Sequence, residues 1–160
     1  MFFKKAFTLT ELVLVFGIIA ILLSFVYFNL FGSQHRVTLD STVDVLINDL
    51  KNQQNKAVTG SIENRSSYDA YGVFFQSDKY ILFHGPNFNA DNPDNFSTNL
   101  NEGTTFSPIN LPDSQIVFAS FSGEIASFNP SQNTVTILDS YTGQQKVITI
   151  NRYGVITNIN

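Results

Sequence analysis

An apolar run near the N-terminus limits what this chain can become. From Phe7 to Phe31 the run holds a single charge, Glu11, and no further Asp, Glu, Lys or Arg occurs before Arg36. The uncharged stretch of 24 residues would form a helix roughly 36 Å long, and a bilayer core is about 30 Å thick. The sequence therefore predicts that residues 7–31 form a transmembrane helix, with membrane lipid as one of its partners.

Glu11 is the exception within that run. A carboxylate inside a membrane helix costs on the order of 1 to 3 kcal/mol, depending on its depth, so it needs a reason to be there. Two simpler interpretations compete with a functional one. The run could be a cleaved secretory signal, although it is long for one and no A-x-A pattern closes it. It could also be a plain single-span anchor in which Glu11 has no role.

Lys4 and Lys5 lie on one flank of the apolar run. Basic residues stay on the cytoplasmic side, which predicts a single-pass protein of the inner membrane with its C-terminal domain outside the cytoplasm. From Gly32 onward the chain has seven Lys and Arg residues and twelve Asp and Glu residues. This acidic balance argues against nucleic acid as a partner, because phosphate binding needs basic clusters.

The helix is expected to continue beyond the apolar run. Apolar residues recur at helical spacing, which gives residues 32–60 one apolar face. The stripe consists of Leu39, Val43, Leu46, Ile47 and Leu50, with an extension through Ala57 and Val58. Gly60 is placed to end the helix. One rod from about Thr8 to Thr59 is the main interpretation, and two helices bent at Gly32 are the alternative.

After Gly60 the apolar period changes to two, which is typical of strands. The expected strands are Ala70–Phe75, Lys79–His84, Gln115–Phe121, Glu124–Phe128, Thr134–Leu138, Gln145–Ile150 and Val155–Ile159. Residues 86–112 form a polar stretch that is expected to be a long loop, and such loops are often functional. The predicted fold class is therefore α+β: a long spine helix, transmembrane in its first half, packed against an antiparallel β domain (residues 61–160) of about seven short strands, probably in two sheets.

The segment Ala6–Val15 (AFTLTELVLV) resembles the signal of type IV prepilins and pseudopilins. The resemblance implies a leader of residues 1–6, cleavage by a prepilin peptidase between Ala6 and Phe7, and methylation of the new amino group of Phe7. It also implies that Glu11 directs assembly by pairing with the amino terminus of a neighbouring subunit. Ala6 departs from the family, which usually has Gly before the cut.

The C-terminal part is similar to the H-type minor pseudopilins of type II secretion and to related minor pilins. The motifs that carry this resemblance are IVFASFSGEI and INRYGVI (residues 116–125 and 150–156). It implies a structural subunit of a secretion or pilus-like filament in protein transport. Its expected partners are other pilin or pseudopilin subunits, the prepilin peptidase and an inner-membrane assembly platform.

The residues give no support to an enzyme. The chain has no cysteine and two histidines, His35 and His84, and it lacks a nucleophile-elbow motif. No cofactor, metal or catalytic residue is predicted, although a calcium ion near Asp91 and Asp94 stays an alternative. A membrane-anchored extracytoplasmic binding module that forms no filament is the second candidate function, and an anchored hydrolase is the third.

Overall fold

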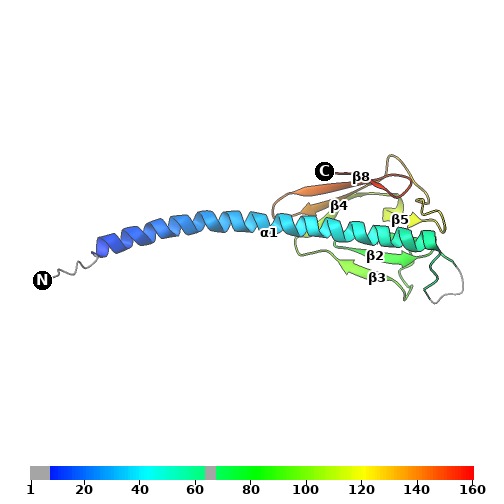
Figure 1. Ribbon diagram of the computed structural model, residues 1–160, viewed down its shortest axis with the longest axis horizontal. Coiled ribbons are helices and arrows are strands. Elements are labelled where there is room, and N and C mark those ends of the chain that lie inside the picture. Colours follow the sequence, from blue (N-terminus) through cyan, green and yellow to red (C-terminus); the bar gives the residue numbers. More distant parts are fainter. Residues whose placement is uncertain (1–7, 64–67) are drawn as a thin grey trace.

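The computed structural model describes the backbone of residues 8–63 and 68–160, and within that range it leaves the side chains of residues 25–38 undescribed. In the described residues, one α-helix is followed by a β domain that packs along the C-terminal half of the helix (Figure 1). The first half of the helix projects from the domain, with no strand beside it in this view (Figure 1).

Helix α1 runs from Leu9 to Thr59, which is 51 residues. Thr8 caps its first turn, and Gly60 ends it in the left-handed conformation at φ 63° and ψ 44°. Glycine suits this position because it has no Cβ to clash there. A straight helix of this length extends over roughly 75 Å.

The prediction of a membrane span was wrong. Among the residues whose side chains are described, no helix is both long enough and apolar enough to cross a membrane. The predicted fold class is corrected accordingly, and the predicted localisation as a single-pass protein of the inner membrane is withdrawn.

Over the residues that the structure describes, the β domain consists of two four-stranded antiparallel sheets, so the predicted number of about seven strands is corrected to eight. The first sheet has the order β3-β2-β1-β5 and the second has the order β4-β6-β7-β8. Their bounds are β1 Tyr71–Phe75, β2 Lys79–His84, β3 Phe96–Asn99, β4 Thr104–Asn110, β5 Gln115–Phe118, β6 Thr134–Asp139, β7 Gln145–Ile150 and β8 Ile156–Ile159. A short 3₁₀ turn, Pro112–Ser114, leads into β5.

The predicted hairpins β1–β2 and β6–β7 are confirmed by their antiparallel pairing. Two strand predictions were wrong. The polar stretch 86–112 contains β3 and β4, which lie at sheet edges where polar side chains face solvent and the apolar alternation is weak. The expected strand Glu124–Phe128 is a loop that touches β5 through one isolated bridge, Phe118 to Ile125.

The core lies between α1 and the two sheets. Leu39, Val43, Leu46 and Leu50 of α1 are at most 4% exposed, as the stripe predicted, while Val58 is 43% exposed. They pack against the inward residues of the strands, which include Val73, Phe75, Ile137 and Ile148. The buried half of α1 therefore anchors the helix, and its first half is left to project.

Candidate functional site

The N-terminal segment of α1, Leu9–Leu23, is the most unusual surface of the molecule. Eleven of its large apolar side chains are between 43% and 80% exposed. They are Leu9, Leu12, Val13, Leu14, Val15, Phe16, Ile18, Ile19, Ile21, Leu22 and Leu23. Soluble monomers rarely expose so large a contiguous apolar surface, so such a patch marks an interaction site.

The apolar side chains surround the whole helix. Leu12 to Phe16 are five successive apolar residues, and successive residues point about 100° apart around the axis. A helix that is apolar on every side is normally buried on every side. The N-terminal segment therefore fits an environment with several neighbours around it, rather than the flank of its own β domain.

Glu11 lies at the exposed start of this segment and forms a capping box with Thr8. The backbone N–H of Glu11 donates to Thr8 Oγ1 over 3.3 Å, and the backbone N–H of Thr8 donates to Glu11 Oε2, also over 3.3 Å. The Thr8 hydroxyl is 3.2 Å from the same Oε2 atom. Two N–H groups that the helix cannot pair by itself are thereby satisfied.

The capping role of Glu11 was missed at the sequence level, although a signal for it exists. Thr8-Leu-Thr-Glu11 matches the pattern of Ser or Thr followed three residues later by Glu, just before an apolar run. The carboxylate also lies at the positive end of the helix dipole, which stabilises an anion there. Glu11 is therefore held at the helix terminus in the single chain.

The other residues of the predicted processing site are not described. Lys4, Lys5, Ala6 and Phe7 lie outside the described residues, so the predicted cleavage and methylation stay predictions. Of the predicted site residues Ala6, Phe7 and Glu11, only Glu11, the predicted assembly residue, lies among the described residues. His35 also lies among the residues whose side chains are not described.

His84 is the centre of a second polar cluster, at the end of β2. Its Nδ1 atom is 3.0 Å from Asp69 Oδ2, and its Nε2 atom is 3.3 Å from Asp94 Oδ2 and 3.0 Å from the Asn92 amide nitrogen. The imidazole side chain is 15% exposed. His84 thus joins the segment before β1 to the loop between β2 and β3, which is a structural arrangement.

The loop near Asp91 and Asp94 was the alternative site for calcium. The Asp94 carboxylate faces His84, and no cluster of three or more metal-ligating residues occurs in the part of the chain that the structure describes. Calcium takes six to eight oxygen ligands, and this loop does not assemble them. The described geometry therefore gives no support to that alternative.

Comparison with known proteins gave no match: no family model, curated protein or solved structure matches the chain. Function is therefore inferred from the exposed N-terminal segment and from the position of Glu11.

Proposed function

We propose that this protein is a structural subunit of a pilin-like filament, assembled through the N-terminal segment of α1. The observation that carries the proposal is the apolar segment Leu9–Leu23, exposed on all sides and projecting from the β domain (Figure 1). Copies of this segment packed side by side would remove each other's apolar surface from water. The resemblance of residues 6–15 to prepilin signals favours the same function.

The energetics favour a role for Glu11 as well. Full burial of one large apolar side chain contributes about 1.5–3 kcal/mol. Eleven half-exposed side chains thus offer a gross gain on the order of 10 kcal/mol, and association costs about 4–15 kcal/mol. The free energy gained from apolar packing is therefore close to the cost of association. Assembly by this segment needs a further favourable contact.

A charge pair at Glu11 supplies that contact. In the single chain, each hydrogen bond of the capping box is at least 3.2 Å long and involves a neutral donor. Cleavage after Ala6 would create an ammonium group at Phe7, and an ammonium of a neighbouring subunit would bind the carboxylate more strongly than a neutral N–H does. Leaving either charge unpaired in an apolar assembly would cost about 3–5 kcal/mol.

The test is to produce the full-length protein in bacterial cells that contain a prepilin peptidase and to measure the N-terminal mass of the mature chain. The expected product begins with methylated Phe7. Filaments sheared from the cells would then be quantified by sedimentation and electron microscopy for the wild type and Glu11→Ala. Asp44→Ala is the matched control, since Asp44 is an exposed carboxylate on the same helix.

We expect Glu11→Ala to remove the chain from filaments and Asp44→Ala to leave it there. An uncut chain that still begins at Met1 would overturn the processing step. Incorporation of Glu11→Ala at the wild-type level would overturn the assembly role of Glu11.

A further inference from the structure

A groove lies between the C-terminal half of α1 and the edge strand β3 of the first sheet. It consists of two hollows with volumes of about 370 and 230 Å³, and the larger is within the range of ligand sites. Asp49 of α1 and Phe96 of β3 line the larger hollow. Val45 and Thr98 line the smaller one on the same two elements, with Tyr80 of β2 between them. The hydrogen bond from Tyr80 to Asp49 lies where the two hollows meet.

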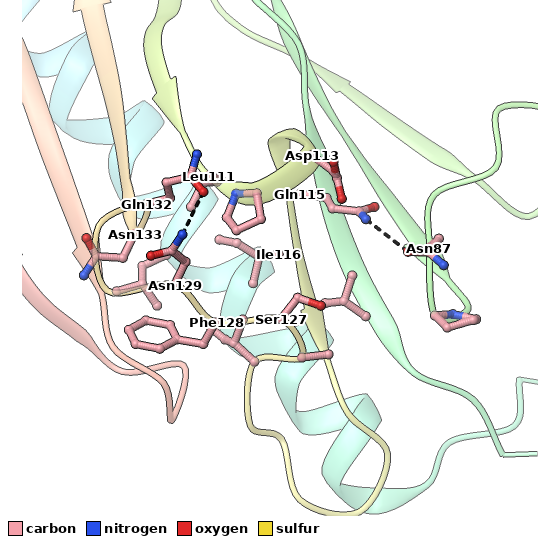
Figure 2. Close-up of a pocket in the computed structure, with 16 residues that line it drawn as sticks. Asn87, Leu111, Asp113, Gln115, Ile116, Ser127, Phe128, Asn129, Gln132 and Asn133 are labelled. Carbon is pink, nitrogen blue, oxygen red and sulfur yellow. Dashed lines mark hydrogen bonds between the residues drawn. The ribbon is translucent and has the colours of Figure 1, made fainter.

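The hollow beside β5 is a weaker candidate for a binding site. It has about 50 Å³ of free volume, far less than the several hundred Å³ of typical ligand sites. Its side-chain amides are paired with one another, as Figure 2 shows. The Asn129 amide N–H donates to Gln132 Oε1 over 2.9 Å, and Gln115 Nε2 is 3.4 Å from Asn87 Oδ1. The groove beside β3 is larger, and its polar groups are less completely satisfied.

The outer edge of β3 is open to a further strand. The Leu100 N–H donates to the Asp78 carbonyl over 2.9 Å, at the end of the pairing between β3 and β2. Because alternate residues of an antiparallel strand face opposite edges, the backbone groups of Ser97 and Asn99 point away from β2. Figure 1 shows β3 at the outer side of the domain, with no strand beyond it in that view. Such an edge can accept an extended chain as an added strand.

Asp49 brings a negative charge without a counter-charge to the groove. Its carboxylate is half-buried and accepts a hydrogen bond from the Tyr80 hydroxyl. In the part of the chain that the structure describes, no Lys, Arg or His forms an ion pair with Asp49. A half-buried carboxylate is more favourable with a cation beside it.

The cations that line the larger hollow have other anionic partners. Lys56 Nζ is 2.6 Å from Glu63 Oε1. The imidazole of His84 lies between Asp69 and Asp94, at 3.0 and 3.3 Å. Neither side chain is therefore available to neutralise the carboxylate on the helix.

Gln53, one turn further along α1, adds an unsatisfied acceptor. The residue lines the larger hollow and is 3% exposed, and its Oε1 atom has no hydrogen-bond partner. Buried polar atoms without a partner are uncommon in native proteins. An amide group turns about its terminal bond at little cost, so this oxygen can accept from a donor that enters the groove. Gln53 and Asp49 are four residues apart and share one face of the helix.

We propose that the groove binds an extended segment of another protein, which adds to β3 as a strand and places an arginine beside Asp49. A guanidinium carries five N–H donors in a planar fork, which suits a carboxylate and a neighbouring amide oxygen. Phe96 is 64% exposed and lines the same hollow, so its ring offers the guanidinium a face to stack on. Alternate side chains of the added strand face α1, and an apolar one next to the arginine in this series would lie near Val45, which is 47% exposed.

The partner is a different protein rather than a second copy of this chain. The four edge strands that the structure describes, β3, β4, β5 and β8, contain no Lys or Arg. Arg152, shortly before β8, donates two hydrogen bonds to Glu124 Oε2 over 3.1 and 2.9 Å. The inference is independent of filament assembly, because the groove lies beside the C-terminal half of α1 and not at Leu9–Leu23.

Fluorescence anisotropy with the full chain in mild detergent and labelled peptides tests the proposal. The probes are Thr-Val-Thr-Arg-Thr and Thr-Arg-Thr-Val-Thr, with blocked ends, because the segment can add in either direction. We expect at least one of them to bind. Its citrulline analogue keeps the shape of arginine without the charge and should bind about tenfold more weakly or worse, the effect of losing one charge-assisted hydrogen bond.

Methylation of the peptide backbone tests strand addition while the protein stays unchanged. An added strand donates to β3 through alternate N–H groups only. N-methylation of one alternate set should therefore abolish binding, and N-methylation of the other set should leave it intact. Binding that is insensitive to both sets would overturn the strand addition.

Asp49→Asn tests the charge on the helix. It keeps an oxygen that accepts from Tyr80, so the fold is retained, and it should weaken the arginine peptide by about tenfold. Asp44→Asn is the matched control, because it removes an exposed carboxylate of the same helix that lines neither hollow. It should leave the affinity unchanged, and the circular dichroism spectra of both variants should match the wild type.

Three results would overturn the proposal. They are failure of both arginine peptides to bind, equal binding of the citrulline analogue, and an equal loss of affinity in Asp49→Asn and Asp44→Asn. Self-association of the chain that the arginine peptide reverses would assign the groove to a second copy and overturn the choice of partner.

Discussion

The hydroxyl of Tyr80 donates a hydrogen bond to Asp49 Oδ2 over 2.5 Å, which joins β2 to the helix α1. Tyr80 is 1% exposed, and its ring packs edge-on against Phe106 of the second sheet. Burial raises the pKa of Tyr80 well above its usual range, and the hydrogen bond and charge of Asp49 raise it further. One side chain thus connects the helix with both sheets.

The first prediction is a loss of stability at alkaline pH that depends on Tyr80. The folded protein holds the phenolic proton more tightly than the unfolded chain, whose tyrosine pKa is about 10. The stabilisation is therefore complete below about pH 10 and falls by about 1.4 kcal/mol for each further pH unit until the raised pKa is reached. Urea unfolding at several pH values measures it.

Tyr80→Phe is the matched variant for this prediction. It should lower the free energy of unfolding at pH 8 by about 1.5–3 kcal/mol, the usual value of a hydrogen bond to a charged group. The difference from the wild type should shrink as the pH rises above 10. A difference that stays constant between pH 8 and pH 11 would contradict the role of the phenolic proton.

The second prediction concerns the capping box at the start of α1. Thr8→Ala removes the hydroxyl that accepts from the Glu11 N–H, which should cost about 1 kcal/mol in local helix stability. Faster amide hydrogen exchange in the first turn measures the loss. Thr10→Ala is the control, because its hydroxyl contacts Thr8 Oγ1 and caps no backbone group in the described contacts. Equal exchange rates in both variants would count against the cap.

The third prediction ranks the two carboxylate partners of His84, Asp69 and Asp94, by their contribution to the free energy of unfolding. The side chain of Asp69 is 29% exposed and that of Asp94 is 59% exposed, so solvent screens the second pair more strongly. Asp94→Ala should therefore cost less than about 1 kcal/mol, and Asp69→Ala should cost more, up to about 3 kcal/mol. Urea unfolding of the two variants gives the order, and the reverse order would refute it.

The fourth prediction concerns Gly72 in the centre of the first sheet. A Cβ at this position would collide with the ring of Phe83 and lie 2.7 Å from the Ile116 carbonyl oxygen. The carbonyl belongs to the paired strand β5 and cannot move freely. Gly72→Ala should therefore lower the free energy of unfolding by about 1–3 kcal/mol, as overpacking does.

Gly143→Ala measures the cost of backbone strain at a position where the added Cβ causes no collision. Gly143 has φ 69°, and a Cβ there would meet no atom within 4 Å. Its cost should be about 1–2 kcal/mol, from the left-handed conformation alone. Gly143→Asn should recover part of this loss, since Asn tolerates that conformation, whereas Gly72→Asn should be worse than Gly72→Ala. Recovery at both positions would contradict the collision at Gly72.

Short-range patterns in the sequence predicted the parts of the fold that depend on interactions between nearby residues. The spacing of Leu39, Val43, Leu46 and Leu50 predicted the buried face of α1, and the hairpins around residues 76–78 and 139–143 were found where the turn residues predicted them. The strands β3 and β4 were missed because edge strands need little apolar alternation.

By itself, the sequence determined that an apolar helix with one carboxylate begins this protein and that an amphipathic continuation leads into a β domain. Helical and strand periodicities are local properties, and a few successive residues specify them. The tertiary structure decided that the apolar stripe of α1 is buried against residues of both sheets and that Leu9–Leu23 projects uncovered. Those outcomes depend on which surfaces pack together, and packing joins residues that are far apart in the chain.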